Sequence, residues 1–386
     1  MAIASVLPAE TIEFEILPRL PVKSLLRFKS VFCKSWNSLI SSRDFIKSVR
    51  NSNHDSLTLI CMRNNSWDCQ VFTYIIGCID GLVCFSNDYK DGRTTMFKIW
   101  NPATKQCLEI EPPPQGFDFE TQGWCDFGFG FDSVTNDYKI ICVVLEEQQP
   151  LVGYIYSCNS GCWSKITPSN FLHQGDISPV PFIFNGSPFW LVSQTRYGKE
   201  SLTIISCDVR DEIFRLLPDL VPTDKSCNSN LMKFRDSLAV MFYDAKLFSE
   251  ETINIYIFDE RCENWSKTSI GSFKIWNPKP TSLTAIGFLG CSNRDDILFL
   301  YPFIYNKYCV RPGYAIKSVG EVLKNYTIKS PGKEVDLYID LGLGLTDYSE
   351  SLVFIDGMKP CSGTEDEIRY YYLQRKSRFS GQAFRP

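Results

Sequence analysis

The chain has 386 residues, a formal net charge of −4 at pH 7, 44% hydrophobic residues and 22% charged residues. This length allows one small module plus one large domain, or two or three medium ones. The composition is that of an ordinary soluble protein, and the charge argues against nucleic-acid binding, which needs a dense basic face to neutralise phosphates.

No pattern of export or membrane spanning is visible. The longest apolar runs, at 74–79 and 297–301, are far shorter than the roughly 20 residues of a membrane-spanning helix. The N-terminus has no basic segment followed by an apolar core, as a secretory signal would. We therefore expect a cytoplasmic chain without a membrane partner, with the nucleus as a second compartment and with its 16 cysteines reduced.

Residues 7–46 carry a series of short helical signals. Pro8 can open a first helix, because the fixed φ of proline suits the first turn. The dipeptide Leu20-Pro21 then forces a corner, since a residue before proline is pushed out of the helical conformation. A second helix follows this corner, and Trp36 lies in a third with apolar residues at helical spacing. So small a unit cannot bury all of its apolar surface alone, which favours packing on the rest of the chain or on a partner.

This segment resembles an F-box, on Leu7-Pro8, Leu20-Pro21-Val22-Lys23-Ser24-Leu25, Arg27-Phe28-Lys29 and Cys33-Lys34-Ser35-Trp36. The resemblance implies a three-helix module over residues 1–50. It also implies binding to the Skp-type adaptor of an SCF (Skp, cullin, F-box) ubiquitin ligase, and through that adaptor to a cullin. The adaptor contacts that we expect on this basis are Leu7, Pro8, Ile12, Ile16, Leu20, Pro21, Val22, Leu25, Leu26, Phe28, Val31 and Trp36.

The polar stretch 50–56 marks the predicted exit from the helices, and from about residue 57 the pattern is typical of strands. Short runs of β-branched, aromatic and aliphatic residues are separated by turn pairs such as Asp80-Gly81. This pattern continues to about Ile355. The final residues, 359–386, are expected to form a mobile tail.

An internal repeat of about fifty residues runs through the strand-rich region. Trp163, Phe214 and Trp265 follow one another at intervals of 51 residues. Nine residues before each of them lies an apolar residue of a predicted strand; these are Tyr154, Ile205 and Tyr256. Ile99 and Leu108 fit the same spacing more loosely. Repeats of this length that are made of four short strands are typical of propeller blades of the kelch-like class.

The predicted fold is therefore α+β and multidomain, with N-terminal helices followed by an all-β propeller. Strand counting favours six blades, with seven as the alternative and a two-sheet sandwich as a further one. Strands from both ends of the region, 57–62 with 335–345 and 352–355, would close the ring and leave no exposed sheet edge.

Residues 57–356 resemble the plant F-box-associated domain, and the pollen S-locus F-box proteins are similar in layout. The matching strings are Asp80-Gly81-Leu82-Val83-Cys84, Ile99-Trp100-Asn101-Pro102-Ala103-Thr104, Gly128-Phe129-Gly130-Phe131-Asp132, Asn136-Asp137-Tyr138-Lys139 and Glu350-Ser351-Leu352-Val353. This resemblance implies that the propeller recognises a protein that is to be ubiquitinated.

The residue types of an active site or metal site are nearly absent. The two histidines, His54 and His173, neighbour no nucleophile motif, and no CxxC pair is present to hold zinc. We therefore expect no catalysis, no cofactor and no metal.

The sequence thus predicts a receptor whose helices hold the adaptor and whose propeller holds a target, such as a ribonuclease in the S-locus manner. Rival hypotheses are an F-box interaction protein without a role in degradation and a propeller enzyme such as a glycosidase. Loops that differ between blades carry specificity in such rings, and we expect target contacts in loops 111–121 and 167–180. The chosen residues are Pro112, Pro113, Pro114, Phe117, His173 and Asp176.

Overall fold

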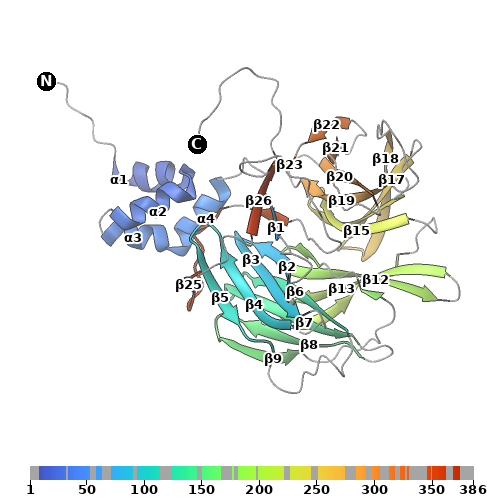
Figure 1. Cartoon of the computed structure of the whole chain (residues 1–386), viewed down its shortest axis with the longest axis horizontal. Coiled ribbons are helices and arrows are strands. Elements are labelled where there is room, and N and C mark those ends of the chain that lie inside the picture. Colours follow the sequence, from blue (N-terminus) through green and yellow to red (C-terminus); the bar gives the residue numbers. More distant parts are fainter. Residues whose placement is uncertain are drawn as a thin grey trace.

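A computed structural model gives the structure of the chain, with helices to one side of a large body of strands (Figure 1). The structure describes residues 8–31, 34–52, 58–62, 71–89, 94–113, 124–145, 150–166, 176–177, 181–196, 199–220, 227–244, 251–273, 284–292, 297–304, 313–317, 322–326, 328–329, 346–348, 350–361 and 368–373.

The N-terminal segment is helical, as predicted, and its first corner lies where proline places it. Ile12 donates its backbone N–H to the carbonyl of Pro8 at 3.2 Å, so the first turn begins at this proline. Leu20 is extended, with φ −81° and ψ 148°, because the following Pro21 disfavours the helical conformation. The helical elements are α1 (Ala9–Thr11), a π-helix (Ile12–Ile16), a 3-10 helix (Leu17–Arg19), α2 (Val22–Val31), α3 (Lys34–Ser41) and α4 (Arg43–Ser52).

The division of this segment differs from the three predicted helices. Ser42 separates α3 from α4, and its hydroxyl accepts the backbone N–H of Phe45 at 3.4 Å, a side-chain cap of the kind that starts a helix. The predicted polar exit at 50–56 was wrong for its first three residues, because α4 continues to Ser52.

The described strands form six antiparallel sheets. The first sheet holds β2 (Val71–Ile79), β3 (Leu82–Tyr89), β4 (Thr94–Asn101), β5 (Gln106–Ile110) and β25 (Lys359–Pro360); the second holds β6 (Trp124–Asp132), β7 (Asp137–Leu145), β8 (Val152–Ser157) and β9 (Cys162–Ile166); the third holds β10 (Asp176–Ile177), β11 (Phe182–Phe184), β12 (Ser187–Arg196), β13 (Lys199–Asp208) and β14 (Ile213–Leu216). The fourth sheet holds β15 (Cys227–Phe234), β16 (Ser237–Asp244), β17 (Glu251–Asp259) and β18 (Asn264–Phe273), and the fifth holds β19 (Thr284–Ser292), β20 (Ile297–Ile304), β21 (Gly313–Lys317) and β22 (Val322–Tyr326). The sixth sheet, which we call the closing sheet because it pairs strands from both ends of the strand-rich region, holds β23 (Ile328–Lys329), β26 (Ile368–Leu373), β1 (Thr58–Met62) and β24 (Thr346–Tyr348).

The closing sheet joins both ends of the strand-rich region. Strand β1 lies between β24 and β26, with Leu59 opposite Asp347 on one side and opposite Tyr371 on the other. Pairing between the two ends of the region is therefore confirmed for 57–62. Its partners differ from those predicted, because 335–345 lies outside the described residues and 352–355 forms no strand.

The expectation of a mobile tail over 359–386 was wrong for two segments. Residues 368–372 of β26 pair with β1, and β25 pairs with β5, with Lys359 opposite Cys107. Local composition did not show this, because a short strand is recognisable only once its partner is known.

The repeat at intervals of 51 residues corresponds to equivalent positions in three sheets. Trp163, Phe214 and Trp265 lie on the last strands of the second, third and fourth sheets. Each is the second residue of its strand and pairs with the residue seven positions earlier; the pairs are Tyr156–Trp163, Cys207–Phe214 and Phe258–Trp265. In the first sheet the equivalent residue is Cys107, opposite Trp100. The residue predicted for this position, Leu108, is therefore one position too late in the sequence.

All three of these residues reach the preceding sheet. The indole N–H of Trp163 donates to the carbonyl of Glu111, just after β5, and that of Trp265 donates to the carbonyl of Pro218, just after β14, both at 2.9 Å. Phe214 cannot donate, but its ring lies against the second sheet, where a Cβ on Gly153 would come within 2.6 Å of Cζ. The same strand position thus links successive sheets.

We expect Trp163→Phe and Trp265→Phe each to lower the free energy of unfolding by about 1 kcal/mol, the typical net contribution of one hydrogen bond. The ring itself should be accommodated, because Phe214 occupies the equivalent position. Urea unfolding measures the change, and Val134→Ala, at an exposed turn, is the control. Unchanged stability in both tryptophan variants would contradict this account of the links between sheets.

A second prediction concerns pH. Burial raises the pKa of Asp126, on β6, to about 7, so the folded protein keeps a proton that the unfolded chain loses near pH 4. The stability linked to this proton is present at low pH and disappears as pH rises through about 7. Asp126→Asn should therefore flatten the decline, with a difference of at most roughly 4 kcal/mol above pH 7. Urea midpoints from pH 5 to pH 8 test this, and identical slopes for the two proteins would contradict it.

Candidate functional site

The helices share one apolar core. Its buried members are Leu17, Val22, Leu25, Ile40, Phe45, Val49 and, from the strand-rich region, Leu352. Val22 and Leu25 are fully buried, because the face of α2 that carries them packs inward. These two predicted adaptor contacts therefore lie in the interior of the module. They can stabilise a partner-binding surface but have no exposed surface of their own to contact a partner.

Five further predicted contacts lie at the boundary between this core and the solvent. They are half-buried and pack against the core: Ile12, Leu20, Leu26, Phe28 and Trp36. Phe28 and Trp36 meet edge to face, with ring centroids 6.1 Å apart and an interplanar angle of 87°, an arrangement that aromatic pairs prefer. These side chains stiffen the module and also present part of their surface.

The remaining predicted contacts differ in what the structure describes. Pro8 and Pro21 are exposed, and Ile16 keeps 38% of its surface accessible. Leu7 and the side chain of Val31 lie outside the described residues.

Phe14 is the most exposed large hydrophobic residue of the described chain, at 69%. Sequence reasoning missed it because it lies off the row that Ile12 and Ile16 form at normal helical spacing. Residues Ile12–Ile16 form a π-helix, whose wider turn changes which side chains share a face. The signal in the sequence was a large aromatic residue between two acids, Glu13 and Glu15.

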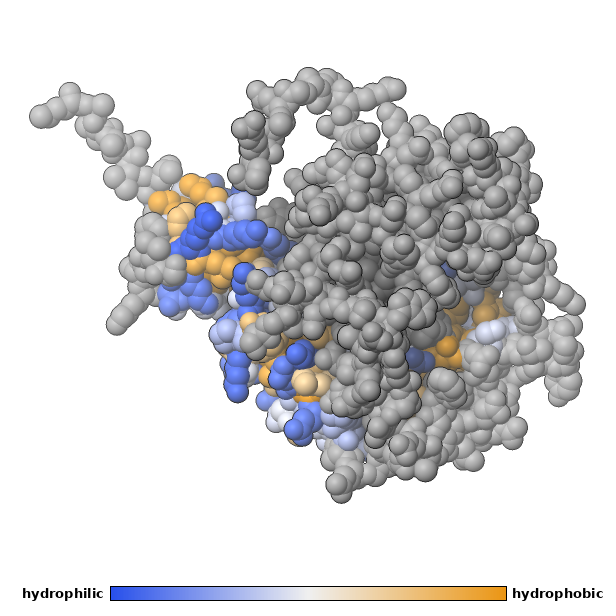
Figure 2. Space-filling view, in the orientation of Figure 1, coloured by the Kyte–Doolittle hydropathy of each residue, from blue (hydrophilic) through white to orange (hydrophobic). Residues whose placement is uncertain are grey.

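Charged residues accompany this apolar surface. Glu10 and Glu15 are exposed near Phe14 in the sequence, and Arg19, Lys23 and Arg27 are exposed beyond the first corner. Figure 2 shows the resulting mixture of hydrophobic and hydrophilic surface on the helices. An apolar centre with a charged margin is the usual anatomy of a protein-binding surface.

Residues 350–358, which we call the strap, attach the helical module to the first sheet. Leu352 of the strap belongs to the helical core and is only 7% exposed. The side-chain amide of Asn101, at the end of β4, donates to the carbonyls of Ser351 and Val353 at 3.1 and 2.8 Å. Ala103, next to this asparagine, also packs against the helical core.

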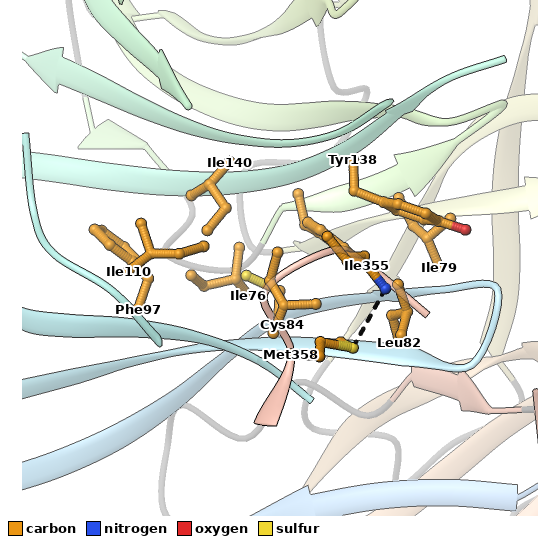
Figure 3. Packing of buried hydrophobic residues seen from close by; sticks show 12 residues of the cluster. Ile76, Ile79, Leu82, Cys84, Phe97, Ile110, Tyr138, Ile140, Ile355 and Met358 are labelled. Atoms are coloured by element: carbon orange, nitrogen blue, oxygen red, sulfur yellow. Dashed lines mark hydrogen bonds between the residues drawn. The ribbon is translucent and has the colours of Figure 1, made fainter. Parts of the chain in front are cut away.

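The other end of the strap lies in the core between the first and second sheets. Ile355 and Met358 pack there among residues such as Leu82 and Tyr138 (Figure 3). The N–H of Ile355 points at the Met358 sulfur at 3.5 Å, and the turn between them needs Gly357 at φ +89°, a conformation that favours glycine. The strap thus touches the helices and the sheets at once.

Only part of the predicted target surface lies in the described residues. Pro112 is half-buried and Pro113 is buried, so the latter presents no surface to a target. Asp176 begins β10 and is opposite Ser193 in the third sheet, which makes it part of a strand rather than of a free loop. Pro114, Phe117 and His173 lie outside the described residues.

The thiols of the sheets are small interior groups. Burial raises the pKa of Cys84, Cys142, Cys158 and Cys207, so they stay protonated and poorly nucleophilic. Among the described residues no group of three or more His, Cys, Asp and Glu side chains could hold a metal ion. No helix in that part of the chain is long and apolar enough to cross a membrane.

Known proteins were compared with the chain at the levels of structure and sequence. Among solved structures, the β-propeller domain of the Trilobed protease from Pyrococcus furiosus has a TM-score of 0.36 and 13% identity, covering 72% of this chain and 76% of that one. The polysaccharide lyase Uly1 has a TM-score of 0.43 and 11% identity, covering 81% and 91%. Both TM-scores are below 0.5.

Relatives in sequence come from Arabidopsis thaliana. An F-box/kelch-repeat protein is 29% identical over 276 residues, covering 61% of this chain and 72% of the relative. An F-box protein is 32% identical over 253 residues, covering 57% and 64%, and another F-box/kelch-repeat protein is 28% identical over 274 residues, covering 66% and 62%. The matched parts span about two thirds of these relatives.

The model of the F-box associated beta propeller domain matches residues 27–312. This match begins within α2 and ends just before β21, the third strand of the fifth sheet. Together with the Arabidopsis relatives it confirms the resemblance to plant F-box proteins. The chain belongs to the family of the F-box associated beta propeller domain.

Proposed function

We propose that the protein is the substrate-recognition subunit of an SCF-type ubiquitin ligase. In this proposal the helices bind a Skp-type adaptor, which connects to a cullin, and the sheets bind the target protein. The observation that carries it is the apolar surface around Phe14 and Ile16 on a helical module within a family named for its association with the F-box. The chain itself supplies no covalent step and acts by holding the target near the catalytic subunits.

We infer that the six sheets are the blades of a closed ring. Strands of successive sheets contact one another, in the order β2, β6, β12, β15 and β19, and β2 also contacts β24 of the closing sheet. The pairing of β1 with β24 and β26 supports closure by strands from both ends. Radial repetition of this kind leaves only short, protected sheet edges.

Target recognition is assigned to the connections between blades. Of the two chosen segments, 111–121 follows β5, and the part of 167–180 that precedes β10 follows β9, so both lie in sequence between one sheet and the next. A ribonuclease, as for pollen S-locus F-box proteins, is one class of target that this arrangement would serve. The place of action is then the cytoplasm, and the nucleus as well.

A second candidate function keeps the adaptor but omits degradation. It has the same module surface and differs only in what happens to the bound target. Ubiquitination assays with the assembled ligase and affinity-purified targets separate the two. Target chains that carry ubiquitin support the receptor function, whereas stable complexes without modification support the interaction protein.

The test of adaptor binding uses surface residues, since Leu25→Ala would open a cavity in the helical core. We expect Phe14→Asp to weaken binding of a Skp-type adaptor by at least about 2 kcal/mol, roughly 30-fold, as for an aromatic anchor at an interface. Isothermal titration calorimetry with the full chain measures this change.

Val134→Asp, at an exposed turn of the second sheet, is the matched control and should bind like the wild type. Circular dichroism verifies that both variants are folded. Wild-type affinity of Phe14→Asp would remove the basis of the proposed adaptor surface.

A further inference from the structure

The helical core is incomplete without a residue from the other end of the chain. Leu352 is a buried member of the same cluster as Leu17, Val22 and Leu25. These helical residues belong to the first 49 positions of the chain. A core with so few large side chains buries little apolar area. Each of its members therefore has a large effect on the order of the helices.

The strap cannot easily move away from the sheets. Asn101 is fully buried, and its amide donates to the carbonyls on both sides of Leu352. Its side-chain oxygen accepts the backbone N–H groups of Ala103 and Thr104 at 3.0 and 3.3 Å. A buried amide that is satisfied in this way is costly to displace, because its groups would lose their partners.

The position of the strap also depends on the C-terminal strands. Strand β24, just before the strap, pairs with β1, and β25, just after it, pairs with β5. Between them, Ile355 and Met358 are inserted between the first and second sheets (Figure 3). The strap that carries Leu352 therefore lies between two strands that each pair with a strand far earlier in the chain.

We propose that Leu352 and Asn101 are positioning residues that couple the order of the helical module to closure of the strand-rich region. With the strap in place, the helices have a complete core and hold Phe14 and Ile16 in a defined arrangement. In a chain whose closing sheet is not formed, the helices lack Leu352 and the module surface is poorly ordered. The consequence for an adaptor rests on the proposed function, whereas the coupling itself does not.

Under this coupling a ligase would recruit only receptor chains with a closed target-binding region. The adaptor would then discriminate against chains that are truncated or misfolded at the C-terminus. This selection needs no additional binding site, because it uses the same residues that complete the helical core.

The experiment measures hydrogen–deuterium exchange in the full chain. We expect Leu352→Ala and Asn101→Leu to speed exchange of the amides in α2 and α4 at least ten-fold, with exchange in β6–β9 changed less than two-fold. Phe354→Ala is the matched control, because Phe354 lies two residues further along the strap and is 50% exposed. Leu352→Met, which keeps an apolar side chain of similar volume, should restore slow exchange.

Two results would overturn the proposal. One is wild-type exchange in α2 and α4 of Leu352→Ala, since the helices would then be ordered without the strap. The other is equal acceleration in helices and sheets, which would make Leu352 a support of the whole chain rather than of the helical module.

A separate arm measures the affinity of the same variants for a Skp-type adaptor. Leu352→Ala should bind at least ten-fold more weakly, and Phe354→Ala should bind as the wild type does. If the wild type itself does not bind, the proposed function fails while the exchange result still decides the coupling. If Leu352→Ala exchanges fast in the helices but binds normally, the consequence for the adaptor is overturned.

Discussion

The side-chain amide of Asn101 connects parts of the chain that are 250 residues apart in sequence. It donates on both sides of Leu352 and accepts from the turn that follows β4. Because the residue is fully buried, each of these groups would be costly to leave unpaired. The position of the helices relative to the first sheet depends on this interaction, since Leu352 lies in the helical core only while its flanking carbonyls are held.

The sheets are joined by a different device, which is repeated. An aromatic residue on the last strand of a sheet leans on the sheet before it, through an indole N–H in Trp163 and Trp265 and through packing alone in Phe214. A further link is ionic: the ammonium group of Lys139, on β7, lies 2.8 Å from Glu212 and also donates to the carbonyl of Val209. This lysine is buried, so pairing with both groups offsets the loss of hydration.

Much of the fold could be predicted because the signals are local. Proline positions gave the first corner of the helices, and alternating patterns gave the strands. The spacing of Trp163, Phe214 and Trp265 gave the repeat, since a residue that does the same work in each sheet recurs at the same interval. The site was predicted less completely. Val22 and Leu25 were recognised as important, but periodicity alone could not tell an interior contact from a partner contact. Phe14 was missed because a π-helix alters the facing of side chains.

The sequence by itself determined the class of the protein: helices first, then strands in repeated units, with the short strings that identify the family. It did so because turns, periodicity and repeats depend on residues that are close in sequence or at a fixed spacing. The tertiary structure alone decided that β26 belongs to a sheet, that Leu352 lies in the helical core, and that Asn101 holds the strap. These contacts join residues far apart in the chain, and each partner has an ordinary local pattern. These contacts can be recognised only when folding brings the two ends of the chain together.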